Sequence, residues 1–480
     1  MSSRYRRSLF LFRRDLRLYD NRALQAACSA SKSIVPAFIF DPRQADPEAN
    51  DYFSPNAFQV LIHALQDLAA ALDEQDGRLY LFEGAAPDVL RDVLASGAID
   101  AVFVSRDYTP FARKRDAKLA KVADSSGTDF HAIPNVLLTE PEDIRTSSGD
   151  PFFVYSPFRK AVRKASIARP EPLRPVHWET RDGSVETISL DAYRREPNPD
   201  LAVSGRRADA LPVLDRMDEF RYYSKKRHRM DDYGQATMCS AALKFGTISP
   251  REMYHAVASE WGPRHKLISQ LMWRDFYTHF AWRFPSMFGQ AIRPKDRFLG
   301  WRDDAEALER WKKGKSGVPL VDAGMRQLVA TGYMHNRARM AVASYLSKHL
   351  LLDWRDGEQF FARHLLDYDP SVNNGNWQWS ASVGLDSIPM RMFNPYTQLE
   401  KYDKGAEYTK RWVPELRDVD AGVLTSGNAL DFSAHAPDYP APIIEHGAAY
   451  QRAKEAYSEA MEAAKSEGYG RYDVDSKLVA

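Results

Sequence analysis

The first third of the chain alternates short apolar runs with amphipathic segments, and this alternation limits the possible folds more than any other feature. Four runs are predicted to be buried strands, at residues 8–12, 33–40, 78–84 and 100–107. The segments between them, such as "NAFQVLIHALQDLAAALDEQ", have the apolar spacing of helices. Alternation of this kind is typical of a parallel, doubly wound sheet.

The pattern changes twice further along the chain. Residues 135–205 are rich in Pro and turn formers, which indicates a long interdomain connection. From residue 206 onward the apolar period is helical. The sequence therefore predicts an α/β domain of Rossmann-like type over 1–134, a linker over 135–205 and an all-α domain over 206–470.

Composition excludes several function classes. The chain has 480 residues, only two Cys and a net charge of +1. Two Cys cannot build a disulfide framework or a four-Cys metal site, and no His/Cys/Asp set has metal-ligand spacing. The first strand carries neither GxGxxG nor a P-loop. No apolar run is long enough for a membrane span, and the N-terminus lacks the apolar region of a signal peptide. With only two Cys, we expect a reducing cytosol or nucleus.

Two helical segments place unusual side chains on one face. Gln270, Trp273 and Arg274 share a face that suits a flat ligand with polar edges, although a core helix with a satisfied Gln also explains it. Asn336, Arg339 and Met340 share another, where the Arg fork could bind phosphate or carboxylate. The alternative for the second face is a basic surface helix.

The stretch "DYDPSVNNGNWQWSAS" (367–382) is rich in acids, amides and indoles. Asp367 and Asp369 could accept from hydroxyl or ring N–H groups, and Asn373 could donate to a ring nitrogen that gains an electron. The alternative is a turn followed by a helix cap. Spaced, oxidisable indoles could pass an electron hole outward, or could simply anchor a core; these are Trp301, Trp354 and Trp377.

The segment "RYYSKKRHR" (221–229) holds five Lys or Arg in nine residues. It could face the phosphates of a nucleic acid, or it could be a solvated charge run.

Taken together and in order, these motifs resemble the photolyase/cryptochrome family. The resemblance rests on "FRRDLRLYDNRAL", "EDIRTSSGDPFFVYSPFRKA", "ALKFGTISPREMY", "WRDFY", "GMRQLVATGYMHNRARM", "DYDPSVNNGNWQWSAS" and "MFNPYTQLEKYD". It covers nearly the whole chain and is nearest to class I-like photolyases for cyclobutane pyrimidine dimers. It implies FAD in the helical domain and light-driven electron transfer to a dimer flipped out of UV-damaged DNA.

The resemblance also assigns roles to residues. Contacts with FAD are implied for Tyr223, Thr237, Ser240, Arg274, Asn336, Arg339, Asp367, Asp369 and Asn373, with Asn373 facing the ring nitrogen N5. A photoreduction relay is implied for Trp377, Trp354 and Trp301, from the flavin outward. Substrate contacts are implied for Arg227, Gln270, Trp273, Asn336, Arg337, Met340 and Trp379, with Arg227 and Arg337 on DNA phosphates.

Two departures from the family pattern bear on the substrate. Dimer photolyases carry Glu at the position of Gln270, whereas photolyases for the (6-4) lesion carry Gln there, as this chain does. The (6-4) photolyases, however, also have two His at the positions where this chain has Asn336 and Met340. The run "ATMCS" (236–240) lacks the first hydroxyl of the usual Thr-Ser-x-Leu-Ser. Cyclobutane-dimer repair is the expectation; the alternatives are a cryptochrome-type photoreceptor without repair and a (6-4) photolyase.

The resemblance further implies a second, antenna chromophore in the N-terminal domain. Residues 105–116 are expected to line its site, and methenyltetrahydrofolate, 8-hydroxydeazaflavin and FMN remain open. We expect a monomer that acts on DNA in the cytoplasm, at the nucleoid if the source is prokaryotic, with no metal and no membrane association.

Overall fold

The computed structural model describes residues 3–95, 98–179, 186–193, 195–231, 236–385, 390–426, 432 and 434–469. These residues fall into two compact units. The first lies within 1–199, 203–221 and 237–282, and the second within 200–202, 222–236 and 283–480. The boundaries expected from the sequence, at 134, 205 and 470, stay a prediction.

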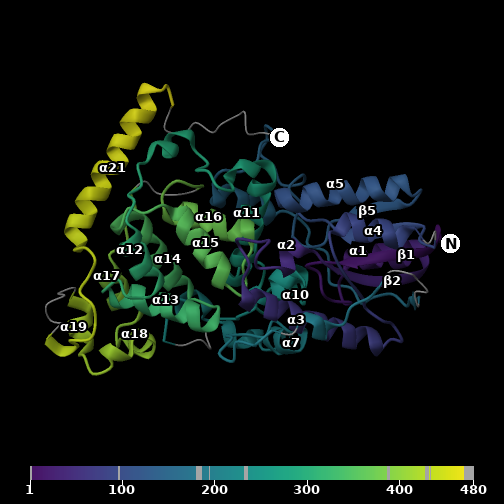
Figure 1. The fold of residues 1–480 in the computed structure, drawn as a ribbon, viewed down its shortest axis with the longest axis horizontal. Coiled ribbons are helices and arrows are strands. Elements are labelled where there is room, and N and C mark those ends of the chain that lie inside the picture. Colours follow the sequence, from purple (N-terminus) through teal and green to yellow (C-terminus); the bar gives the residue numbers. More distant parts are fainter. Residues whose placement is uncertain are drawn as a thin grey trace. The chain divides into compact units, whose positions relative to one another are not determined.

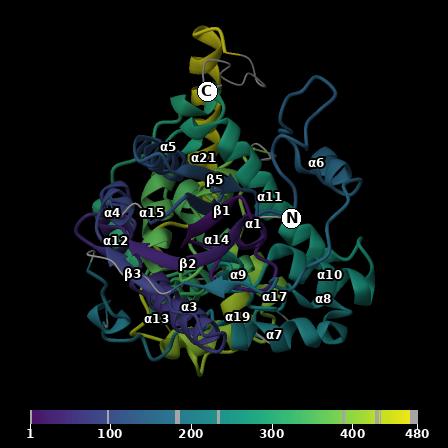
Figure 2. The same ribbon diagram turned by 90° about the vertical axis from the view of Figure 1, so that its right-hand side faces the viewer.

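The first unit is built on one parallel sheet (Figure 2). Its strand order is β3-β2-β1-β4-β5, with β6 beside β2, and every pair is parallel. The four predicted runs correspond to β1 to β4, which confirms the doubly wound parallel sheet. The strands are β1 (Tyr5–Phe12), β2 (Ser31–Phe40), β3 (Tyr80–Glu83), β4 (Ala101–Ser105), β5 (Asp129–Ile133) and β6 (His177–Trp178).

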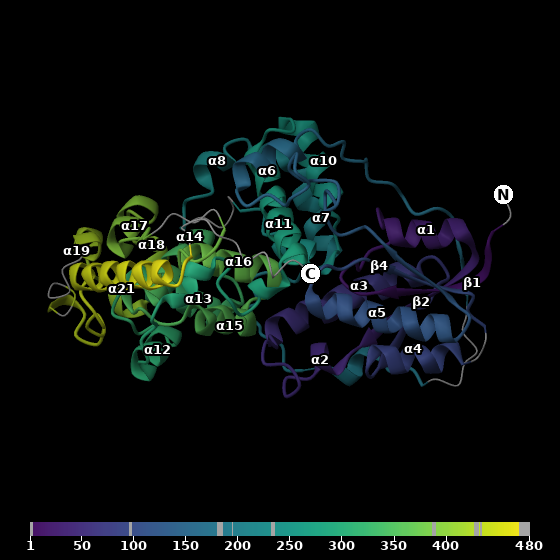
Figure 3. The same ribbon diagram turned by 90° about the horizontal axis from the view of Figure 1, so that it is seen from above.

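Both faces of the sheet are covered, because successive side chains of β1 are apolar on both sides. Leu9 and Leu11 join a core with α4 and α5, whereas Phe10 and Phe12 are buried on the opposite face. Figure 3 shows α1 on one side of the strands and α4 and α5 on the other. The helices of this unit are α1 (Arg22–Ala30), α2 (Pro42–Ala45), α3 (Pro55–Asp73), α4 (Ala86–Leu94), α5 (Pro110–Ser125), α6 (Tyr155–Val162), α7 (Arg207–Asp215), α9 (Ser240–Phe245), α10 (Pro250–Trp261) and α11 (Lys266–Arg283).

The second unit is helical in its described residues (Figure 1). A single apolar core runs through it and includes three tryptophans, Trp311, Trp354 and Trp377. Its elements are α8 (Tyr223–Lys226), α12 (Ala305–Lys312), α13 (Pro319–Thr331), α14 (Asn336–Ser344), the π-helix η6 (Tyr345–His349), α15 (Trp354–His364), α16 (Pro370–Ser380), α17 (Pro395–Tyr402), α18 (Glu407–Trp412), α19 (Ala421–Ser426) and α21 (His446–Ser466). Of the described helices, none is long and apolar enough to cross a membrane.

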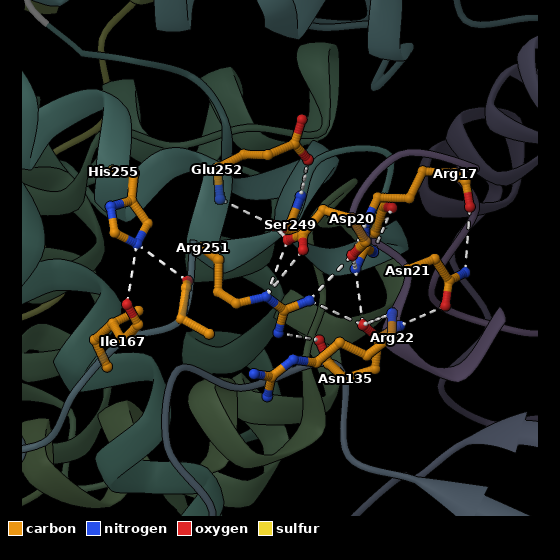
Figure 4. Close-up of polar contacts among 12 residues, drawn as sticks. Arg17, Asp20, Asn21, Arg22, Asn135, Ile167, Ser249, Arg251, Glu252 and His255 are labelled. Carbon is orange, nitrogen blue, oxygen red and sulfur yellow. Dashed lines mark hydrogen bonds and ion pairs between the residues drawn. The ribbon is translucent and has the colours of Figure 1, made fainter. Parts of the chain in front are cut away.

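A buried polar network inside the first unit explains two of the conspicuous motifs (Figure 4). Arg17 and Arg251, each 2% exposed, both donate to the carbonyl of Asp20 and to Oδ1 of Asn135. Arg251 Nε also lies 3.0 Å from Asp20 Oδ2, which accepts from Ser249. The network ties the loop after β1 to the start of α10, so "FRRDLRLYDNRAL" and "ISPREMY" are structural partners in this fold.

Candidate functional site

The acid- and amide-rich stretch forms α16 and the turn before it. Asp369 caps the helix: its Oδ1 accepts from the backbone N–H of Ser371 at 3.1 Å and of Val372 at 3.2 Å, and Pro370 occupies the first helical position. The turn-and-cap reading of this stretch is therefore confirmed for Asp369. The carboxylate is 9% exposed, and its predicted cofactor contact stays a prediction.

Asn373 lies one turn further along the same helix, and its amide orientation follows from a buried acid. Its Nδ2 donates to the carbonyl of Glu358 at 3.1 Å and to the Glu358 carboxylate at 2.9 Å. A carboxylate accepts only, so the NH₂ end of the amide must face it. The sequence led us to expect Asn373 to donate to a ligand; in this arrangement both N–H groups are already used, and the oxygen is the end that can meet one.

Asp367, in the turn before α16, forms an ion pair with Arg339 of α14. Arg339 Nη2 lies 3.2 Å from Asp367 Oδ2, and its Nε donates to the carbonyl of Met334 at 2.8 Å. The second bond fixes the direction of the guanidinium. The ion pair brings two predicted cofactor ligands together, and their opposite charges cancel, so that the pair as a whole carries no net charge.

The three relay candidates share the core of the second unit. Trp377 and Trp354 are each 2% exposed, and Trp301 is half-buried and packs against the same core. Gly357 lets α15 approach α16, because a Cβ there would lie 2.6 Å from Leu346 and collide with the Trp377 ring. The two indoles predicted to be nearer the flavin are thus equally buried, and the one predicted to be outermost is the most exposed of the three.

Trp311 was missed by the sequence analysis. It is fully buried, and its ring meets Trp377 edge to face with 6.2 Å between centroids. Its indole N–H donates to the carbonyl of Val342 at 3.3 Å. Trp311 lies within the charged run "ERWKKGK", where no apolar period marked it.

The predicted substrate side chains of the second unit come from three places: Arg227 directly follows α8, Asn336, Arg337 and Met340 lie in α14, and Trp379 lies in the last turn of α16. Asn336 Nδ2 donates to the Met340 sulfur at 3.7 Å, which confirms that the two share a face. Trp379 is half-buried, and Arg391 lies over its ring at 5.7 Å. Arg391 was not predicted, because it follows α16 in a segment without helical spacing.

Two arginines of this unit act on a third, Arg337. Burial lowers the pKa of Arg337, Tyr402 raises it, and Arg227 and Arg391 lower it further. Tyr223 sits beneath Arg227, whose Cζ lies 6.0 Å from the ring centroid, and burial raises the pKa of this tyrosine. Such a concentration of guanidinium groups favours an anionic partner.

The remaining predicted residues belong to the first unit. On α11, Trp273 stacks on Tyr155 with centroids 3.6 Å apart and planes 8° from parallel, and Tyr155 donates to the carbonyl of Ser269 at 2.7 Å. Gln270 Nε2 reaches back to the carbonyl of Lys266 at 3.4 Å. The sequence offered Tyr155 only within a family motif, so its stacking role was missed.

Arg274, Thr237 and Ser240 were predicted to contact FAD. Arg274 Nη1 donates to the carbonyl of Val136 at 2.7 Å, so part of its fork holds the segment after β5. Ser240 is exposed at the start of α9, and the Thr237 carbonyl accepts from Cys239 Sγ at 3.2 Å. Nothing in these contacts tests the predicted cofactor roles.

A second polar cluster lies beyond the carboxyl ends of β1 and β4, where the strand order reverses. This is the position at which open parallel sheets bind ligands. Arg13 Nη1 and Arg115 Nε both donate to Asp116 Oδ1, at 2.5 and 3.1 Å. Nε and Nη2 of Arg13 and Nη2 of Arg115 are buried and have no hydrogen-bond partner within the described part of the chain. Two guanidinium groups thus share one carboxylate, and Arg115 and Arg43 lie over the Phe111 ring at 5.8 and 5.3 Å.

Within the described ranges, no three His, Cys, Asp or Glu residues gather in a way that could hold a metal ion.

Comparison with known proteins gives one consistent result. Residues 8–176 match the family described as DNA photolyase, and residues 267–459 match the FAD binding domain of DNA photolyase. Curated proteins named deoxyribodipyrimidine photo-lyase, from Synechococcus sp. and Halobacterium salinarum, are 35% and 34% identical over 94% and 91% of this chain and 96% of their own length.

Solved structures agree. An archaeal photolyase from Sulfolobus tokodaii with two FAD molecules is 35% identical, with a TM-score of 0.85 over 94% of this chain and 100% of its own. A bacterial class III photolyase from Agrobacterium tumefaciens is 32% identical, with a TM-score of 0.87 over 96% of this chain and 99% of its own. A Synechocystis cryptochrome is 26% identical, with a TM-score of 0.86 over 95% and 100%.

Proposed function

The chain belongs to the DNA photolyase family, and on that premise we propose that it splits cyclobutane pyrimidine dimers in UV-damaged DNA with the energy of light. The observation that carries the proposal is identity of 35% over 94% of the chain to an enzyme named deoxyribodipyrimidine photo-lyase. The alternatives are less favoured. Position 336 is Asn and position 340 is Met, so the His pair expected for (6-4) repair is absent, and the cryptochrome compared is only 26% identical.

The polar side chains of the second unit fit a flavin. Its ring edge needs both acceptors and donors, and the unit offers the oxygen of Asn373, the carboxylates of Asp367 and Asp369, and the guanidinium of Arg339. When bound and reduced, FAD supplies the excited electron that opens the cyclobutane ring and takes it back after the two C–C bonds have broken.

The chain's own residues hold charge and protons in place around that reaction. Because both N–H groups of Asn373 are engaged by Glu358, its oxygen would accept a hydrogen bond from a protonated ring nitrogen. The Arg339–Asp367 pair places a positive and a negative charge at fixed positions, and such a fixed pair does not reorganise when an electron leaves.

For the substrate, we propose aromatic and thioether contacts with the flipped bases. Trp273 and Trp379 offer flat faces, Met340 a polarisable sulfur, and Gln270 and Asn336 hydrogen-bonding ends. Arg227 and Arg337 would bind the DNA phosphates, and Arg391 joins them because of its electrostatic proximity to Arg337. The FAD contacts of Tyr223, Thr237, Ser240 and Arg274 are part of the same proposal.

We also propose that the arginine cluster of the first unit binds the second chromophore. Buried N–H groups without a partner on Arg13 and Arg115 favour an anionic group, and Phe111 favours a ring stacked near it. Among the three candidates this supports the phosphate-bearing FMN over 8-hydroxydeazaflavin. The enzyme is proposed to act as a monomer on DNA in the cytoplasm.

Purified protein, reduced and supplied with an oligonucleotide carrying one cyclobutane thymine dimer, tests the function. We expect the dimer to disappear under blue light, to persist in the dark, and a (6-4) lesion in a parallel sample to persist in both. Intact dimers after illumination, with reduced FAD bound, would reject the proposal. Repair of the (6-4) lesion instead would replace it by the alternative.

A further inference from the structure

Arg337, one of the side chains proposed to bind DNA phosphate, is held by a histidine. Its Nε donates to Nδ1 of His228 at 2.9 Å, and its Nη2 lies 3.4 Å from the same ring. We infer that His228 is a positioning residue, which fixes the fork of Arg337 for a DNA phosphate without neutralising its charge. This inference rests on the proposed function and concerns how the enzyme grips its substrate.

The guanidinium is constrained on several sides. Its Cζ lies 4.3 Å from the centroid of the Tyr402 ring, within the range of a cation–π contact. Nη1 is 4.0 Å from the Met340 sulfur. Because the ring below and the imidazole at the Nε edge set its plane, little rotamer freedom remains to be lost when a phosphate binds.

His228 is itself anchored. It follows α8, and two residues further on the backbone N–H of Met230 donates to the carbonyl of Tyr402 at 3.3 Å. The centroids of the His228 and Tyr402 rings are 5.7 Å apart. The segment after α8, the start of α14 and the end of α17 therefore converge on one guanidinium, within the second unit.

The chemistry of the partner decides the effect on binding. Since Nδ1 accepts from Arg337, that nitrogen is unprotonated, and a ring in this role carries no charge. A carboxylate at the same place would hold the guanidinium equally well but would cancel its charge. Burial lowers the pKa of Arg337, Tyr402 raises it, and Arg227 and Arg391 lower it further, so no carboxylate is among the groups that shift it. An uncompensated Arg337 can release one counterion from DNA, whereas a neutralised one cannot.

Equilibrium binding of dimer-containing duplex DNA, measured in the dark over a range of NaCl concentrations, tests this. His228→Asp should weaken binding about tenfold at low salt and reduce the slope of log K against log salt by about one. His228→Asn, a neutral acceptor, should keep the wild-type slope. Arg337→Gln removes the proposed phosphate contact itself, so its effect gives the largest change in slope that the loss of this contact can cause. His177→Asp is the matched control: it makes the same change at an exposed residue of strand β6 in the first unit and should leave the slope unchanged.

The outcomes separate the two proposals. An unchanged slope in His228→Asp, with a reduced slope in Arg337→Gln, overturns the role of His228. An unchanged slope in both removes Arg337 from the phosphate contacts, and the inference with it. Loss of slope in His228→Asn as well as His228→Asp would show that the imidazole is needed for packing alone, which also counts against it. Failure of the wild-type protein to repair dimers, by contrast, rejects the proposed function whatever the binding slopes are.

Discussion

Each polar side chain proposed to face the flavin is oriented by another group of the second unit. Asp369 caps α16, and Asp367 forms an ion pair with Arg339. Glu358 engages the NH₂ end of Asn373 through the packing of α15 on α16, so the oxygen of that amide is the end left for a ligand.

The relay assignment predicts the behaviour of Trp377→Phe. Phenylalanine fills most of the indole volume but is much harder to oxidise, so light should no longer reduce FAD in the purified oxidised protein. Repair by chemically reduced protein should stay near wild type. Absorption spectra under illumination measure the first and dimer loss the second; Trp412→Phe, a half-buried indole outside the predicted relay, is the control. Normal photoreduction in Trp377→Phe would remove the relay role.

Asp275 predicts a pH dependence of stability. Its carboxylate accepts from the backbone N–H groups of Leu138 and Thr139, and burial raises its pKa to about 7. The folded state therefore holds a proton that the unfolded state releases near 3.8, and this contribution to stability falls as pH rises from about 4 to 7. Each unit of pKa difference corresponds to about 1.4 kcal/mol.

In Asp275→Asn the side-chain oxygen can still accept hydrogen bonds from both N–H groups, but the side chain no longer titrates. The loss of stability between about pH 4 and 7 should therefore be smaller in this variant. Urea midpoints at several pH values across the interval measure it, with the exposed Asp88→Asn as the control. Identical pH profiles for Asp275→Asn and wild type would show that the Asp275 proton is not taken up in this range.

At the scale of elements, the closest contact of α15 and α16 depends on a residue without a side chain. The sequence predicted a turn and a helix cap only for the stretch that forms α16, and "DWRDGEQFF" gave no reason for Gly357. Glycine is needed at position 357 because of tertiary packing: the Trp377 ring and Leu346 occupy the space where a Cβ would stand.

Gly357→Ala is expected to lower the free energy of unfolding by about 1–3 kcal/mol, because overpacking shifts neighbouring side chains. It should also slow the photoreduction of FAD, since the ring that must move is Trp377. Gly300→Ala, at an exposed site with open space around it, should change neither property. Unaltered urea midpoint and photoreduction in Gly357→Ala would mean that the helices can separate freely here.

At the scale of the whole molecule, segments far apart in sequence fold together. Helices α10 and α11 group with the parallel sheet and not with the helices of the second unit. Polar contacts as well as apolar packing hold these helices to the sheet. Arg251 of α10 donates to Asp20, and Asp275 and His279 of α11 form hydrogen bonds with the backbone of Thr139. Helical periodicity predicts that a helix has a buried face, but it does not indicate which other element covers that face.

Asp20 tests this long-range connection. Asp20→Asn keeps the side-chain shape, and Asn tolerates the left-handed backbone found there, with φ of 50°. The change removes the ion-pair partner of the buried Arg251, which should cost on the order of 3–5 kcal/mol in unfolding free energy. Asp88→Asn breaks an exposed pair with Arg91 and should cost about 1 kcal/mol or less. Equal urea midpoints for the two variants would contradict the buried network.

The sequence by itself determined the doubly wound sheet, the helical second half, the family and the residue types around the proposed flavin. These follow from periodicity, caps and motif order, which are properties of contiguous segments. Only the tertiary structure decided that Asn373 presents its oxygen, that Trp311 touches Trp377, that Tyr155 stacks on Trp273 and that His228 holds Arg337. Each of these contacts joins residues from different elements, and their pairing is set by packing, which no local pattern encodes.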